Sequence, residues 1–180
     1  MPQLKGSCHC GAVKFQLFSR AAVPYMRCYC SICRKTAGGG GYAINLSGDY
    51  ATLNVEGEEN LSVYHARGPA GDPEGVSPAE RHFCKKCGSA LWLYDPRWPD
   101  LVHPLASAID TPLPAAPENV YIMLESKPAW VKLPAEAKRT NCYAEYPEES
   151  LADWHRRHSL YDESEDGKPG KHTGKDKSRT

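Results

Sequence analysis

The chain has 180 residues; 22 Lys and Arg balance 22 Asp and Glu, and 41% of the residues are hydrophobic. The neutral charge argues against a dedicated nucleic-acid-binding protein, which usually carries a basic surplus. No apolar run approaches the ~20 residues of a membrane-spanning helix, and no apolar signal-peptide core follows the N-terminus. We therefore expect a cytoplasmic protein without a membrane partner. In that compartment eight cysteines indicate metal or catalytic chemistry rather than disulfides.

Short strands dominate the body of the chain, because apolar and polar residues partly alternate with a period of two. The predicted strands are residues 12–17, 42–46, 61–65, 90–94 and 120–124. Breaks rich in Gly and Pro separate them at residues 38–41, 68–78 and 110–117. The break at 68–78 is interpreted as a flexible surface loop. The pattern predicts a β-rich fold.

One helix is predicted near the end of the body. Pro147 suits a first helical position, and two acidic residues after it suit the positive end of a helix. Leu151 and Trp154 then fall on one side. Residues 162–180 hold five acids and five bases and almost nothing apolar, which predicts a disordered charged tail. The remainder, residues 1–161, is interpreted as a single domain.

Seven of the eight cysteines fall into three close clusters. They are Cys8 and Cys10; Cys28, Cys30 and Cys33; and Cys84 and Cys87. Closely spaced loop residues can point their sulfurs at one ion, and tetrahedral zinc takes thiolates at ~2.3 Å. Free buried thiols and disulfides are the alternatives, and a redox C-x-x-C site would need a βαβ pattern that is absent.

These seven cysteines divide into four and three. Structural zinc has four protein ligands, whereas catalytic zinc keeps three and leaves a position for substrate. The contiguous Cys28, Cys30 and Cys33 are therefore the candidates for an open site, and the two outer pairs for a closed one. In the alternative, Cys142 or a histidine closes the triad. Because Cys142 has no ligand near it in sequence, we interpret it as a small core residue.

Three segments carry these cysteines: GSCHCGAV at residues 6–13, CYCSICRK at 28–35 and RHFCKKCGS at 81–89. They resemble the glutathione-dependent formaldehyde-activating enzyme family, whose domain centromere protein V shares. Residues 120–131 are similar to the family's C-terminal strand with its Lys-Pro-x-Trp ending, and the resemblance covers residues 4–134.

The resemblance implies a β-tent of antiparallel sheets built around zinc-binding loops. It implies two zinc ions, a structural one and a catalytic one. The structural ligands would be Cys8, Cys10, Cys84 and Cys87, and the catalytic ligands Cys28, Cys30 and Cys33. The implied activity joins glutathione and formaldehyde into S-hydroxymethylglutathione, a carbon–sulfur lyase reaction run in reverse. The sequence departs from the family at Gly38–Gly41 and in a Gly- and Pro-rich insertion before Arg81.

An open three-thiolate zinc suits a small-molecule thiol substrate. Glutathione carries two carboxylates, so Arg34 and Lys35, which follow the triad, are candidates to bind it, or else are exposed charges on a loop. The tryptophans Trp92, Trp98 and Trp130 are expected in the core. A non-catalytic, zinc-stabilised binding or scaffold module is the alternative function.

Overall fold

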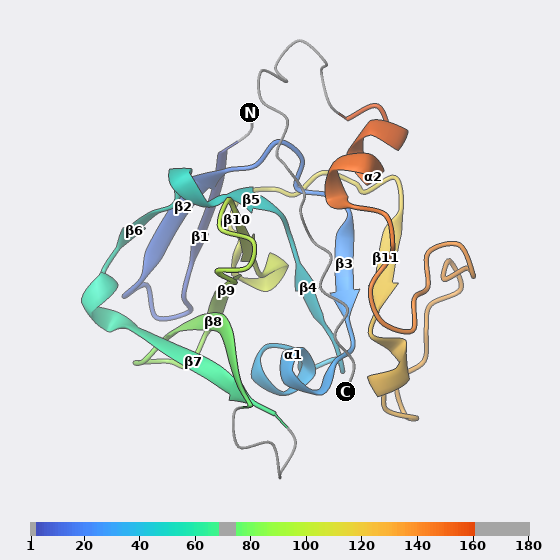
Figure 1. Cartoon of the computed structure of the whole chain (residues 1–180). Coiled ribbons are helices and arrows are strands. Elements are labelled where there is room, and N and C mark those ends of the chain that lie inside the picture. Colours follow the sequence, from blue (N-terminus) through green and yellow to red (C-terminus); the bar gives the residue numbers. More distant parts are fainter. Residues whose placement is uncertain (1–2, 69–74, 161–180) are drawn as a thin grey trace.

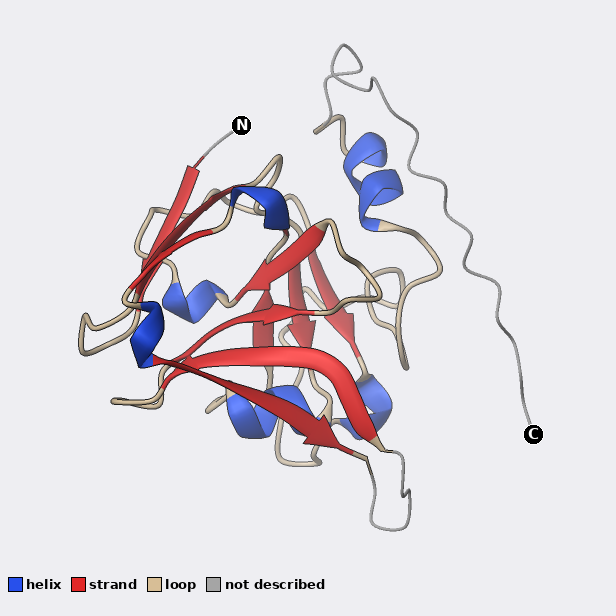
Figure 2. Cartoon of the chain, turned by 60° about the vertical axis from the view of Figure 1, so that its left-hand side comes forward, coloured by secondary structure: helices blue, strands red, loops and turns tan. Residues whose placement is uncertain are grey.

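Three sheets built from eleven short strands make up most of the described structure (Figures 1 and 2). The computed structural model describes residues 3–68 and 75–160. The strands are β1 (Gln3–Ser7), β2 (Lys14–Phe18), β3 (Tyr25–Cys28), β4 (Ala43–Asn45), β5 (Gly48–Asp49), β6 (Asn54–Glu56), β7 (Leu61–Arg67), β8 (Val76–Cys84), β9 (Ala90–Tyr94), β10 (Leu101–Pro104) and β11 (Asn119–Ile122). The helices are α1 (Ser31–Thr36), α2 (Leu151–Arg157) and the 3-10 helices η1 (Tyr50–Thr52), η2 (Glu58–Asn60), η3 (Ala106–Ala108) and η4 (Leu124–Ser126).

The expected mainly β class with a short C-terminal helix is confirmed. The five predicted strands correspond to β2, β4, β7, β9 and β11. Residues 76–78, expected in a loop, instead begin β8. The rest of that loop at 69–74 and the predicted tail at 162–180 lie outside the described residues. The single domain over residues 1–161 therefore stays a prediction.

The first sheet is antiparallel with the order β1-β2-β6. On β2, Phe15 and Leu17 are buried and alternate with exposed residues, as in a strand with one face on the core. Gly6 lies opposite Phe15, and a side chain at Gly6 would run into the Phe15 ring and the Ala108 carbonyl. Phe15 also packs on Trp92 of the second sheet, with ring centroids 5.1 Å apart. The first and second sheets therefore share a core.

Leu17 and Phe18 on β2 provide a matched test of that core. Leu17 is 1% exposed and Phe18 is 39% exposed. We expect Leu17→Ala to lower the free energy of unfolding by about 2–5 kcal/mol, because it removes fully buried methyl groups and leaves a cavity. Phe18→Ala should cost clearly less. Denaturant unfolding of the metal-loaded protein measures both, and equal losses would contradict this description of the core.

The second sheet is antiparallel with the order β5-β10-β9-β8-β7. Two neighbouring rows of side chains cross β7, β8 and β9: Tyr64, Arg81 and Leu93 in one row, and Val63, His82 and Trp92 in the next. Because successive residues on a strand point to opposite faces, the two rows belong to opposite faces of the sheet.

The third sheet has the order β11-β3-β4. Strands β3 and β4 are antiparallel, but β11 and β3 run parallel, so this sheet is mixed rather than antiparallel. Strand β3 ends at Cys28, and helix α1 begins at Ser31, close to the end of β3 and the start of β4 (Figure 1). The sequence thus passes from a half-buried strand, whose last residue Cys28 is buried, into a short helix.

Helix α2 begins at Leu151 rather than near Pro147, because Ser150 caps it: the Ser150 hydroxyl accepts a hydrogen bond from the Asp153 N–H at 3.1 Å. The buried His155 donates from Nε2 to the Val23 carbonyl at 2.6 Å, which holds α2 beside the start of β3 (Figure 1). Across residues 3–68 and 75–160, no helix is both long and apolar enough to cross a membrane.

Candidate metal centres and an adjoining cavity

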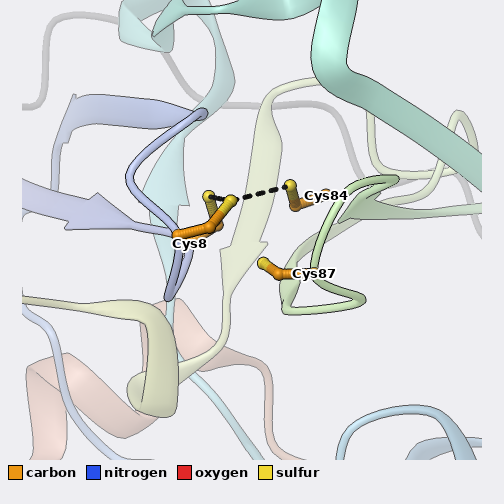
Figure 3. Close-up of side chains that lie close together, drawn as sticks. Cys8, Cys84 and Cys87 are labelled. Carbon is orange, nitrogen blue, oxygen red and sulfur yellow. Dashed lines mark hydrogen bonds between the residues drawn. The ribbon is translucent and has the colours of Figure 1, made fainter.

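Four cysteines from two distant turns meet between the first and second sheets. Cys8 and Cys10 lie in the turn between β1 and β2, and Cys84 and Cys87 lie where β8 turns into β9 (Figure 3). Their four sulfur atoms lie within 4.8 Å of one another. The Cys8 and Cys10 sulfurs are 3.6 Å apart, and the Cys10 and Cys84 sulfurs are 3.8 Å apart.

The two turns share one local structure. The N–H of Gly11 donates to the Cys8 carbonyl at 2.9 Å, and the N–H of Gly88 donates to the Cys84 carbonyl at 2.8 Å. Both glycines have positive φ, +73° and +76°, a conformation that glycine adopts without strain. Hydrogen bonds from Ser89 lower the pKa of the Cys87 thiol to about 5. The Ser89 hydrogen bonds therefore favour a thiolate at Cys87.

The second cluster comes from one continuous stretch of chain. Cys28 ends β3, Cys30 caps the N-terminus of α1, and Cys33 lies in its first turn. The Cys30 sulfur accepts a hydrogen bond from the Cys33 N–H at 3.2 Å, and the three sulfurs lie within 4.8 Å of one another. Hydrogen bonds from the Cys28 and Cys33 thiols lower the pKa of Cys30.

Within the described ranges, no fourth Cys, His, Asp or Glu joins this triad. Cys142 belongs to neither cluster; it is half-buried beside Asn141, with its sulfur 3.6 Å from the Asn141 side-chain oxygen. The structure therefore does not place Cys142 beside the triad as a fourth ligand.

The donor sets fit metal ions. All eight cysteines are free thiols, so none is used in a disulfide. Sulfurs arranged tetrahedrally at ~2.3 Å around one ion lie ~3.8 Å from each other. The two separations in the four-cysteine cluster, 3.6 and 3.8 Å, agree with that value. The chain therefore holds two cysteine clusters able to bind metal ions.

A cavity of about 410 Å³ lies next to the triad. Its lining residues come from α1, β4, β7, β8, β9 and nearby loops, and are Cys33, Thr36, Ala37, Ala43, Asn45, Tyr64, Arg81, His82, Phe83, Gly88, Ala90, Trp92, Leu93 and Leu105. From α1, only the side bearing Cys33 and Thr36 faces it. Arg34 and Lys35 are not among the lining residues, and their role as substrate contacts stays a prediction.

Sequence reasoning did not single out Arg81 or His82 as site residues. Arg81 lies within one of the cysteine-bearing segments, which was a signal that it is near a metal site. The face of the sheet to which its side chain belongs, however, depends on the register of β8 against its neighbouring strands. His82 stacks on Trp92, with ring centroids 4.9 Å apart, and its Nε2 lies 3.0 Å from a Glu80 carboxylate oxygen. Burial lowers the pKa of His82, and the Glu80 hydrogen bond opposes that effect.

Comparisons with known proteins agree on one family. The model of the glutathione-dependent formaldehyde-activating enzyme family matches residues 3–124, which include all seven clustered cysteines. A Halomonas elongata protein provisionally named a glutathione-dependent formaldehyde-activating enzyme is 59% identical over 158 residues, covering 87% of this chain and 97% of that protein. The crystal structure of a Rhodobacter sphaeroides protein is 29% identical, covers 61% of this chain and 91% of that chain, and has a TM-score of 0.46.

Proposed function

Because the chain belongs to the glutathione-dependent formaldehyde-activating enzyme family, we propose that it is a zinc-dependent enzyme acting on the carbon–sulfur bond of a thiol–aldehyde adduct. The expected adduct is S-hydroxymethylglutathione, made from glutathione and formaldehyde. One observation carries the proposal: three thiols lie together with no fourth ligand among the described residues, and one of them, Cys33, lines a cavity. A site built only for stability would use four ligands.

The two clusters take different roles in this proposal. We assign a structural zinc to Cys8, Cys10, Cys84 and Cys87, and a catalytic zinc to Cys28, Cys30 and Cys33. A four-thiolate site is closed and links two sheets. Zinc held by three thiolates has a fourth position free, and there it supplies a Lewis acid that lowers the pKa of a thiol.

The reaction balances without an oxidant or a reductant. In the forming direction, a bond forms between the thiol sulfur and the aldehyde carbon, the carbonyl double bond becomes a single bond, and the thiol proton ends on the oxygen. The reverse direction breaks the carbon–sulfur bond, which is lyase chemistry. The chain contributes by fixing the three sulfurs at the start of α1 and by enclosing the aldehyde beside Cys33.

Arg34 and Lys35 are proposed to bind the carboxylates of glutathione outside the cavity. Both follow Cys33 on α1; Arg34 is half-buried and Lys35 is exposed. Cations one and two positions after Cys33 suit the terminal carboxylates of a tripeptide whose central cysteine reaches the triad.

Exchange of label between formaldehyde and its glutathione adduct tests the proposed reaction. NMR exchange spectroscopy on zinc-loaded protein should show a rate that rises in proportion to protein concentration. The protein-free control is essential because thiols add to formaldehyde unaided. Protein with both clusters filled, yet with no rate above that control for any of several thiols, would contradict the enzyme and support the non-catalytic scaffold alternative.

A further inference from the structure

Arg81 lines the same cavity as Cys33, and its charge interacts electrostatically with the Cys33 thiol. The whole row formed by Tyr64, Arg81 and Leu93 lines this cavity. The Nη1 nitrogen of Arg81 is buried and has no hydrogen-bond partner among the described residues. No Asp or Glu is among the described residues that line the cavity. Because buried polar groups are normally paired, an unpartnered guanidinium nitrogen in a cavity indicates an anionic ligand.

The rest of the wall is mainly apolar. The apolar lining residues are Ala37, Ala43, Phe83, Ala90, Trp92, Leu93 and Leu105. The volume of about 410 Å³ lies within the range of small-molecule sites. Formaldehyde has two non-hydrogen atoms and would fill little of it, since one water occupies ~30 Å³ in the liquid. Glutathione would set several charged groups against apolar surface, which is costly.

We propose that this cavity binds the body of an aldehyde substrate that is apolar and carries one carboxylate, with Arg81 forming charge-assisted hydrogen bonds to that carboxylate. This inference rests on the proposed function, because it assumes the same reaction, with the same bonds formed and broken between the thiol and the aldehyde. It extends the aldehyde from formaldehyde to larger apolar aldehyde carboxylates. Phe83 supplies ring surface for the apolar body, and Arg81 determines specificity.

Two unreactive probes of the same shape test this binding without turnover: 4-methylbenzoate and the neutral 4-methylbenzamide. Each is titrated into zinc-loaded protein and followed by NMR at the backbone amides of Arg81 and Leu93. We expect the benzoate to bind about 10- to 100-fold more tightly than the benzamide, as one charge-assisted pair provides. In Arg81→Met this preference should disappear while benzamide affinity is unchanged.

Two further variants serve as controls. Arg67→Met makes the same charge change at an exposed residue of β7 outside the lining, so it should keep the benzoate preference. Arg81→Lys keeps the cation but not the fork of donors, so it should keep part of the preference; it also preserves the test if Arg81→Met does not fold. Equal affinities of the two probes for the wild type, or an unchanged preference in Arg81→Met, would overturn the proposal.

Zinc content, measured in each variant, separates substrate binding from charge balance. If Arg81 only neutralises the triad, Arg81→Met loses zinc and the wild type does not distinguish the probes. The proposed reaction and the proposed cavity ligand can also be contradicted independently. A wild type that prefers benzoate but gives no protein-dependent formaldehyde exchange would contradict the proposed reaction alone, whereas protein-dependent exchange with equal probe affinities would contradict the cavity assignment alone.

Discussion

We expect Cys84→Ala to leave the chain largely unfolded. Cys84 is fully buried and belongs to the cluster that ties the β1–β2 turn to the β8–β9 turn (Figure 3). A structural zinc contributes ~10–16 kcal/mol in small zinc domains, whereas a whole domain is stable by only ~5–15 kcal/mol. Removing one of four ligands therefore removes an interaction comparable with the total stability.

Circular dichroism and zinc content of purified protein measure this effect. Cys142→Ala is the control, because it also removes a thiol, but a half-buried one that belongs to neither cluster. We expect Cys142→Ala to fold with its zinc content unchanged. A folded, soluble Cys84→Ala variant that retains the full zinc content would show that this cluster does not hold a structural metal.

We expect Cys30→Ala to abolish the protein-dependent rate while the domain stays folded. Cys30 is one of three ligands from a single continuous stretch, so its loss does not separate distant parts of the chain. The exchange rate should fall to that of the protein-free control. The four-cysteine cluster is untouched, so circular dichroism and the unfolding transition should stay close to those of the wild type.

Cys30→Ser separates the lost ligand from a lost helix cap. The Cys30 sulfur accepts the Cys33 N–H at the start of α1, and losing such a cap costs ~1 kcal/mol. Serine keeps an acceptor there but removes the thiolate. Both variants should be inactive, with Cys30→Ser the more stable. A rate in Cys30→Ser near that of the wild type would exclude Cys30 as an essential zinc ligand.

The cysteine clusters could be predicted because their geometry is mostly local. Pairs spaced two or three residues apart can share an ion whatever the sheet topology, and the count of four and three follows from sequence alone. No local pattern joins positions that are 76 residues apart. The prediction that the pair at Cys8 meets the pair at Cys84 therefore depended on counting ligands, because two pairs together make a set of four. The structure brings the two pairs together.

The cavity could not be predicted, because it depends on register between strands. Strand β8 was not expected over residues 76–78, and without its pairing the direction of Arg81 is undetermined. Hydrophobicity also misled: Trp92 is 3% exposed as expected, but Trp98 and Trp130 are 53% and 67% exposed. The residue type alone does not show whether a tryptophan side chain faces the core.

Helix α1 was not predicted for a related reason. Its six residues are too few to show helical periodicity, and its N-cap is a cysteine rather than Ser, Thr, Asp or Asn. The helix matters for the site, because its first turn sets Cys30 and Cys33 toward Cys28, and one side of it turns Cys33 toward the cavity.

Zinc per folded chain is the measurement that tests the two-site account most directly. Elemental analysis of purified wild type and of the folded Cys30→Ala variant compares the clusters in one experiment. Two clusters predict two zinc ions per chain in the wild type and one in Cys30→Ala. One zinc or none in the folded wild type, or the same content in both proteins, would contradict the division into a closed structural site and an open reactive one.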